Sequence, residues 1–168
     1  REGIASIVNP VDENAVEAAL QLREAYGGEV TVITMGPPQA AEALRHTLAM
    51  GADEAVLLTD PASRGSDTLA TSYTLAQMVR KLGAVDLVLC GKQAIDGDTG
   101  QVGPGLAERL GLPQVTFAIE LEVSDGKLRA RRVLDDFFEL VEVKLPAVVT
   151  VVKQINDPRR PSMRNVLK

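Results

Sequence analysis

The chain has 168 residues, 45% of them hydrophobic, and a formal net charge of −5 at pH 7. This length fits one domain of ordinary size with a small additional segment. The net negative charge argues against a nucleic-acid partner, because proteins that bind nucleic acids usually carry an excess of basic residues. No apolar run approaches the roughly 20 residues of a membrane span, and the first residues do not resemble a signal peptide, so we expect no membrane insertion. The single cysteine, Cys90, cannot form an internal disulfide, which favours a reducing, cytoplasmic location.

The first half of the chain alternates predicted helices and strands. Asn9 is predicted to cap the first helix, with Pro10 in its first turn, where a missing N–H costs nothing, and Gly27 at its end. Short β-branched or apolar runs predict strands, and amphipathic runs predict helices. The strands are expected at 29–34, 55–59 and 85–90, and further helices at 37–50 and from a cap at Ser66 or Asp67 to residue 81. Helical crossovers of this length join parallel strands, which predicts an α/β fold with a doubly wound, mostly parallel sheet.

The pattern changes after residue 113. Three β-rich runs follow, at 115–123, 127–133 and 138–144, and Ser124-Asp125-Gly126 is a hairpin signal between the first two. We therefore expect an antiparallel meander, and then an apolar return strand at 145–152. The polar, arginine-rich residues 156–168 predict an extended, exposed C-terminal arm. The expected parts are residues 1–112 (α/β part), 113–152 (meander and return strand of the same domain) and 153–168 (arm).

The stretch 85–104 is the most informative of the sequence. A buried parallel strand ends at Cys90, and a long loop rich in Gly and Asp leads from it into a helix expected at 105–110. Open α/β sheets hold their ligands at such a place, where glycines admit backbone N–H groups close to an anion and the helix dipole adds positive potential. This favours a phosphate-bearing ligand. The loop matches neither GxxxxGK with Ser or Thr nor GxGxxG, and a plain turn is the alternative.

Conventional catalytic groups are scarce. Cys90 is interpreted as a small buried hydrophobe, and His46, the only histidine, as a surface residue in the middle of a helix. No catalytic residue and no metal site is therefore predicted. Asp96 and Asp98 are expected to contact N–H groups of their own loop or a ribose, with Mg²⁺ binding near phosphates as the alternative.

Several blocks of the sequence, in the same order, resemble the beta subunit of electron-transfer flavoproteins, and together they cover nearly the whole chain. They are Asn9-Pro10, Thr34-Met35-Gly36-Pro37-Pro38, Leu48-Ala49-Met50-Gly51-Ala52-Asp53, Gly91-Lys92-Gln93-Ala94-Ile95-Asp96, Gly111-Leu112-Pro113-Gln114-Val115-Thr116, Leu145-Pro146-Ala147-Val148-Val149-Thr150 and Asn156-Asp157-Pro158-Arg159.

The resemblance implies an electron-transfer subunit, not an enzyme, with a Rossmann-like, adenine-nucleotide-binding fold. It would pair with a larger alpha subunit that holds a redox-active FAD, and would exchange electrons with flavin dehydrogenases such as acyl-CoA dehydrogenase. Its own nucleotide is a structural AMP in simple carriers and a second FAD in electron-bifurcating forms; residues 96–104 are similar to the bifurcating forms and favour FAD. The implied nucleotide contacts are Asn9, Pro10, Val11, Asp12, Met35, Gly91, Lys92, Gln93, Ala94, Ile95, Asp96, Gly97, Asp98, Thr99, Gly100, Gln101 and Val102.

The resemblance also gives the arm a role, because this segment docks on partner dehydrogenases in the family. Met163 stands where the family places a leucine anchor. The sequence departs from the family in two ways. The family's further strand before Arg1 and arm beyond Lys168 are not in this sequence. Phe137 and Phe138 replace a more polar stretch, which predicts an apolar contact with either the alpha subunit or the core.

A second class of function is left open from the fold alone. A stand-alone ATP- or AMP-binding sensor, or a nucleotide-hydrolysing domain, uses a similar sheet and loop. Such a protein does not need the meander and the arm that follow residue 111, which favours the electron-transfer subunit.

Overall fold

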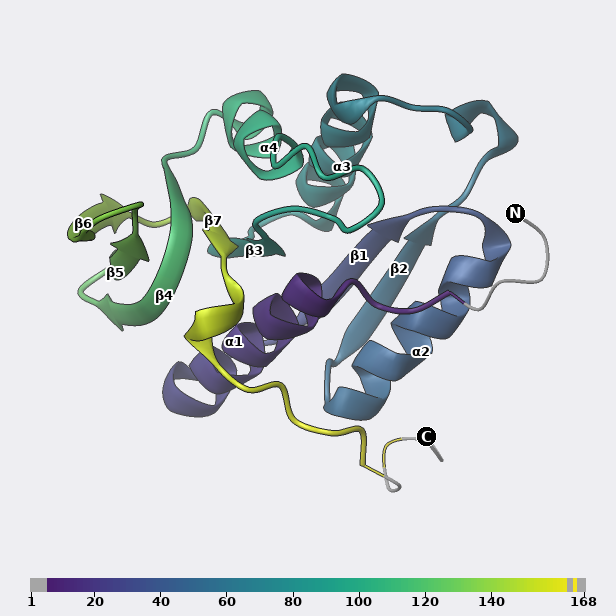
Figure 1. Ribbon diagram of the computed structural model, residues 1–168. Helices are drawn as coiled ribbons and strands as arrows, with labels where there is room; N and C mark the ends of the chain where they lie inside the picture. Colours follow the sequence, from purple (N-terminus) through teal and green to yellow (C-terminus); the bar gives the residue numbers. More distant parts are fainter. Residues whose placement is uncertain (1–5, 163–164, 166–168) are drawn as a thin grey trace.

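The computed structural model describes residues 6–162 and residue 165 (Figure 1). The helices are α1 (Pro10–Tyr26), α2 (Ala41–Met50), α3 (Thr68–Leu82) and α4 (Val102–Leu110). The strands are β1 (Thr31–Met35), β2 (Glu54–Leu58), β3 (Leu87–Gly91), β4 (Gln114–Ser124), β5 (Lys127–Val133), β6 (Phe138–Lys144) and β7 (Ala147–Val151), and the short 3-10 helix η3 (Lys153–Ile155) follows β7.

The described strands form two sheets. Strands β1 and β2 pair in parallel, and a five-stranded mixed sheet has the order β3-β7-β4-β5-β6. In the larger sheet β3, β7 and β4 are parallel, whereas β4, β5 and β6 form the predicted antiparallel meander. We expected one doubly wound sheet for all parallel strands. The described residues do not confirm this detail, because none of their strands pairs with both sheets.

Helices flank the strands on two sides (Figure 1). Helices α3 and α4 lie above the strands in this view and pack on each other, and α1 and α2 lie below. The α/β class predicted from the alternating pattern is therefore confirmed for residues 10–110, and the change to antiparallel strands after residue 113 is confirmed as well.

Helix α1 contributes to two hydrophobic clusters. Ala15 packs with residues of β4, β5 and β7, including Val115 and Val149, whereas the next residue, Val16, packs with Leu20 and Met50 beside the β1–β2 pair. Successive residues of a helix point about 100° apart, so one helix can contribute side chains to two cores only if it is packed against other elements on more than one side. The sequence predicted a single apolar face, and α1 is more deeply buried than that.

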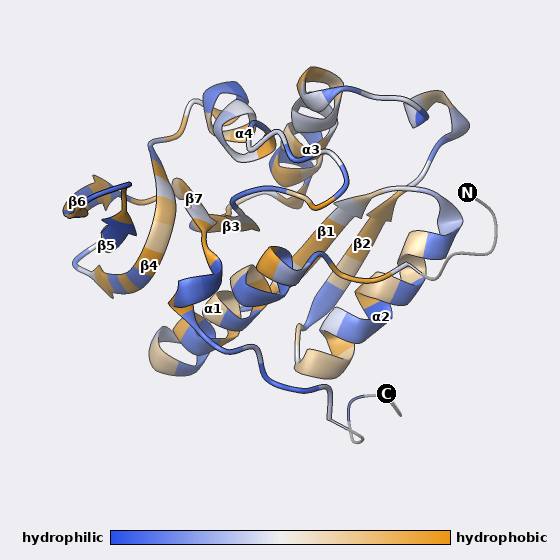
Figure 2. Cartoon of the chain, in the orientation of Figure 1, coloured by the Kyte–Doolittle hydropathy of each residue, from blue (hydrophilic) through white to orange (hydrophobic). Residues whose placement is uncertain are grey.

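Two boundaries differ from the prediction in ways that affect the site. Helix α4 begins at Val102, not at residue 105, so two glycines and Pro104 lie in its first turns. The arm is extended but not free, because Asn156 and Arg159 are half-buried and hydrogen-bonded to α1. Figure 2 shows this segment below α1 as an extended stretch of mostly hydrophilic residues. Across the described residues, no helix combines the length and apolar character needed to cross a bilayer.

Candidate functional site

The end of β3 touches the first turn of α1. The backbone N–H of Gly91, the last residue of β3, donates to Asp12 Oδ1 at 2.6 Å. A Cβ at position 91 would lie 2.9 Å from both Asp12 Oδ1 and the backbone carbon of Val11, closer than real Cβ contacts. Only glycine therefore allows the strand to approach the helix so closely, and the loop that follows starts from a fixed position.

Asn9 ties this loop to α1. Its side-chain amide donates to Gln93 O and to Asp12 Oδ2, both at 2.9 Å, and its Oδ1 accepts from the N–H of Ile95 at 3.3 Å. Asn9 occupies the N-cap position of α1, but its side chain makes no capping hydrogen bond. The predicted capping role is wrong, because the loop N–H of Ile95 takes the side-chain oxygen that a cap would use.

The loop is also folded on itself. The Asp98 N–H donates to Ala94 O at 2.9 Å, and the Gln93 side chain donates to the Asp98 carboxylate. Asp96 Oδ1 accepts from Gly97 N at 2.8 Å. Asp98 and Gly100 have positive φ angles of 50° and 62°, so the loop reverses direction at both residues. No group of three or more His, Cys, Asp or Glu side chains within the described ranges is arranged to hold a metal ion.

Helix α4 starts where the loop ends. Gln101 at its N-cap offers no capping side chain, and Pro104 has no N–H, so the first turn presents the backbone N–H groups of Val102 and Gly103. A Cβ at Gly103 would lie 2.3 Å from Thr150 Cγ2 and 3.2 Å from Cys90 Sγ. This glycine lets the start of α4 pack directly on β3 and β7. The positive end of the helix dipole is thereby held beside the loop.

Two reactive-looking side chains have structural roles. Burial, with a smaller contribution from the Asp12 carboxylate, raises the pKa of the Cys90 thiol to about 12. The thiol therefore stays protonated at neutral pH, which agrees with an unreactive side chain, whereas by its exposed surface Cys90 is half-buried rather than buried. His46 lies in α2, is 39% exposed, and places Nε2 2.9 Å from Glu13 Oε1. It links α2 to α1 and is not paired with a nucleophile.

The structure brings most of the predicted residues into two adjoining segments. Asn9, Pro10, Val11 and Asp12 form the start of α1, and the loop from Gly91 to Val102 joins β3 to α4. Met35 ends β1, in the other sheet. Met163, the predicted docking residue, lies outside the described residues.

The sequence analysis missed a set of polar contacts on the opposite side of α1. Asn14 and Glu17 are 2% and 4% exposed, and Asn156 and Arg159 of the arm cover them. The signal was present, because Asn14, Glu17, Gln21 and Glu24 recur at helical spacing. The sequence analysis assigned no role to these polar residues.

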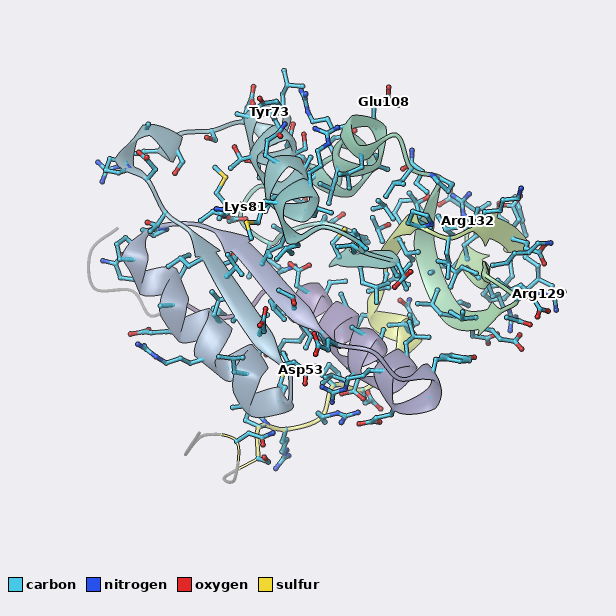
Figure 3. All side chains as sticks on the ribbon, turned by 180° about the vertical axis from the view of Figure 1, so that it is seen from behind. Asp53, Tyr73, Lys81, Glu108, Arg129 and Arg132 are labelled. Carbon is cyan, nitrogen blue, oxygen red and sulfur yellow. The ribbon has the colours of Figure 1, made fainter. Side chains whose placement is uncertain are left out.

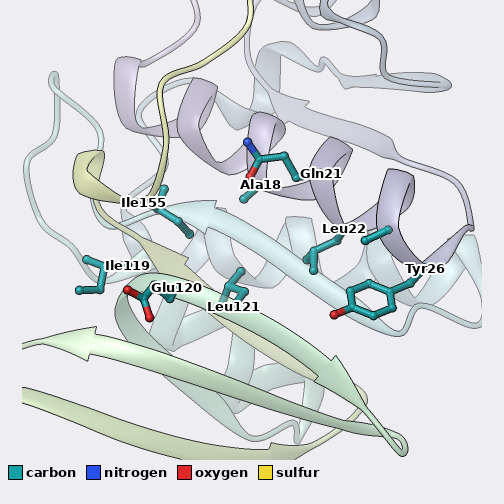
Figure 4. Close-up of a pocket in the computed structure, with 9 residues that line it drawn as sticks. Ala18, Gln21, Leu22, Tyr26, Ile119, Glu120, Leu121 and Ile155 are labelled. Atoms are coloured by element: carbon teal, nitrogen blue, oxygen red, sulfur yellow. The ribbon is translucent and has the colours of Figure 1, made fainter.

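A groove of about 340 Å³ lies between α1 and β4 (Figure 4). Leu22 and Tyr26 of α1 face Ile119 and Leu121 of β4 across it, and the Tyr26 hydroxyl accepts a hydrogen bond from Val123 N at 3.3 Å. None of the predicted nucleotide contacts lines this groove.

The meander exposes apolar side chains on its last strand, β6, and on the residue directly before it. Phe137 is 60% exposed, Phe138 57% and Leu140 82%, and the Arg131 guanidinium stacks 4.2 Å from the centre of the Phe138 ring. These exposures exclude a core role for the two phenylalanines. The neighbouring β5 strand is basic, and Figure 3 shows its Arg129 and Arg132 at this end of the molecule.

The comparisons with known proteins agree with the resemblance. Residues 1–166 match the family model described as electron transfer flavoprotein domain. An electron transfer flavoprotein subunit beta from Clostridium acetobutylicum is 55% identical over 166 residues, covering 99% of this chain and 64% of the relative. The caffeyl-CoA reductase-Etf complex subunit CarD of Acetobacterium woodii is 54% identical, with 99% of this chain and 64% of the relative covered. Protein FixA of Azorhizobium caulinodans is 47% identical over 175 residues, with 100% and 62% covered.

This chain thus spans a little under two thirds of the length of these relatives. The family match includes both the loop between β3 and α4 and most of the arm, the two segments singled out above. The chain belongs to the electron transfer flavoprotein family and is similar to its beta subunits.

Proposed function

We propose that this chain is the nucleotide-binding part of an electron transfer flavoprotein beta subunit. In this role it pairs with an alpha subunit that holds a redox-active FAD, and it passes electrons between that flavin and flavin dehydrogenases. The electron is carried by the cofactor, so the protein needs to supply position, orientation and electrostatics rather than an acid or a nucleophile. The protonated Cys90 thiol and His46, which is paired with Glu13, agree with a protein that supplies neither a nucleophile nor an acid.

The observation that carries the proposal is the meeting of two helix starts at one loop. Asn9 and Asp12 bind the loop from the α1 side, and α4 begins at its other end without a side-chain cap. The residues present fit the phosphates of an adenine nucleotide, because backbone N–H groups and helix dipoles provide positive potential without bulky side chains. Lys92, half-buried in the same loop, adds a cationic side chain.

The nucleotide contacts proposed are the seventeen positions that the resemblance implied, from Asn9 to Asp12, at Met35, and from Gly91 to Val102. We propose FAD as the nucleotide of this subunit, with AMP as the alternative. The similarity of residues 96–104 to bifurcating forms supports FAD. A relative at 54% identity is named as a subunit of a caffeyl-CoA reductase-Etf complex, which gives a related protein that works inside a reductase complex. Helices on both sides of the strands agree with a doubly wound, Rossmann-like arrangement in the whole subunit.

The exposed apolar side chains of β6 and of Phe137, directly before it, support a partner. The sequence left two alternatives for Phe137 and Phe138, a contact with the alpha subunit or a place in the core, and their exposure excludes the core. We propose that the alpha subunit covers this edge of the meander. Edge strands with exposed apolar side chains are unfavourable in water, and they are common where another chain adds to the sheet.

The visible spectrum and nucleotide content of the full-length heterodimer test the proposal. Two flavins per heterodimer support FAD in this subunit, and one flavin with AMP released on denaturation supports the simple carrier. A colourless protein that hydrolyses ATP would instead support the nucleotide-hydrolysing alternative and end the proposal.

A variant locates the site. Asn9→Ala removes the hydrogen bonds to Gln93, Ile95 and Asp12, and we expect the adenine nucleotide of this subunit to dissociate roughly tenfold faster. Gln154→Ala removes a similar amide from an exposed position and serves as the control. Equal nucleotide retention in the two variants would place the nucleotide elsewhere.

A further inference from the structure

The buried polar stripe of α1 consists of Asn14, Glu17, Gln21 and Glu24, and it is organised around one carboxylate. Glu17 is 4% exposed, and a buried charge is costly unless it is paired and hydrogen-bonded. Burial alone raises the pKa of Glu17, but hydrogen bonds and charge from Arg159 outweigh it and hold the pKa below its usual range. Gln21 Nε2 adds a hydrogen bond to Glu17 Oε1 at 2.9 Å.

Arg159 satisfies this carboxylate from the arm. Its backbone N–H and Nε donate to Glu17 Oε2 at 3.1 and 2.8 Å, and Nη2 donates to Oε1 at 3.0 Å. The other side of the guanidinium reaches Glu24, with Nη1 2.5 Å from Oε1 and Nη2 3.1 Å from Oε2. This two-sided contact uses the planar fork of arginine, which lysine does not reproduce.

Asn156 secures the arm one helical turn earlier. Asn14 Nδ2 donates to Asn156 O at 2.8 Å and to Asn156 Oδ1 at 3.0 Å, and Asn156 Nδ2 donates back to Asn14 O at 3.0 Å. Residues 156–159 therefore follow the axis of α1 in a fixed register. Farther along, the Ser162 N–H donates to Ala49 O at 3.0 Å, at the end of α2.

We propose that Arg159 is a positioning residue for partner docking: its pairing with Glu17 and Glu24 sets the register and direction of residues 156–162, the part of the arm presented to a flavin dehydrogenase. This inference rests on the proposed function. A segment already held in one path loses less conformational entropy when a partner binds than a free tail would lose, so the clamp lowers the cost of docking.

Hydrogen exchange in the full-length heterodimer tests the clamp directly. In Arg159→Gln we expect the Ser162 N–H to exchange roughly tenfold faster, because the arm opens more often. Arg160→Gln is the matched control. It removes the same charge from the adjacent exposed residue, which makes no ion pair with the described residues. Equal exchange in the two variants overturns the clamp.

Electron-transfer kinetics test the consequence for docking. With a flavin dehydrogenase as the electron donor, Arg159→Gln is expected to raise the KM for the heterodimer roughly tenfold at unchanged kcat and flavin content. Arg159→Lys keeps the charge but loses the fork and should recover part of the loss. Glu24→Gln removes only the exposed half of the clamp, keeps Glu17 paired, and should give a smaller rise in KM, which guards against a folding defect in the arginine variants.

The two possible failures are distinguishable. If the wild-type heterodimer accepts no electrons from any flavin dehydrogenase, the proposed function is wrong and the docking inference falls with it. If the wild type transfers electrons but Arg159→Gln keeps the KM of Arg160→Gln, only the positioning role of Arg159 is overturned.

Discussion

Gly103→Ala should destabilise the fold through a single contact. The added Cβ would lie 2.3 Å from Cγ2 of Thr150, which is 3% exposed, so neither group has space to move away. Overpacking a closed site costs about 1–3 kcal/mol, and a contact this short belongs near the upper end. Alanine regains up to about 1 kcal/mol over glycine in a helix. The expected net loss in the free energy of unfolding is therefore about 2 kcal/mol.

Urea unfolding measures this loss as a lower midpoint at unchanged slope. Thr150→Ser is the matched partner, because it removes Cγ2 but keeps the hydroxyl that accepts from Phe117 N at 3.1 Å. The double variant should recover most of the 2 kcal/mol, about 1 kcal/mol or more of coupling in a double-mutant cycle. Gly97→Ala, where a Cβ meets nothing within 4 Å, should change stability little. The packing argument fails if Gly103→Ala matches Gly97→Ala, or if the double variant shows no recovery.

Three further outcomes follow from the site and the arm. With its pKa raised to about 12, the Cys90 thiol should react with iodoacetamide at pH 8 at least ~1,000-fold more slowly in the native protein than free cysteine does; a comparable rate would show an accessible thiolate. Asp12→Ala leaves the Gly91 N–H without its acceptor and should lower the free energy of unfolding by about 1–3 kcal/mol, and a neutral result in urea would contradict this role. Because the pKa of Glu17 is lower in the folded protein than in the unfolded chain, its stabilisation is complete above the unfolded pKa of about 4.3 and is lost as pH falls through the folded value. The protection factor of the arm, which is the exchange rate corrected for the intrinsic rate at each pH, should therefore fall only below about pH 4.3, and a fall between pH 7 and 5 would point to another group.

Helix caps and turns could be predicted from the sequence where a residue interacts with its neighbours in the chain. Asp67 caps α3 through a hydrogen bond from Ala70 N, and Asp125 and Gly126 turn the meander hairpin with φ angles of 53° and 71°. Both features depend on a few adjacent residues, so propensities and turn rules suffice to find them. The strands on either side were predicted to within a residue or two for the same reason.

The errors occurred where distant segments decide. The start of α4 was placed too late, since Gly103 and Pro104 look like loop residues. The constraint on Gly103 and Gly105 is the close approach of Thr150 and Ser72, which only the folded chain reveals. Asn9 was read as a helix cap, but the loop 84 to 86 positions later uses its side chain. The burial of Glu17 likewise depends on Arg159, which is 142 residues away in sequence.

The double use of α1 has a consequence for how the molecule comes apart. Ala15 belongs to the hydrophobic cluster at the five-stranded sheet and Val16 to the cluster beside the β1–β2 pair, so helix α1 is common to both clusters. If the residues around either cluster unfold and α1 detaches, apolar side chains of the other cluster are exposed to water as well. The two sheets share no hydrogen-bonded strand among the residues that the structure describes, but they should still unfold as a single cooperative unit, with one calorimetric peak for both.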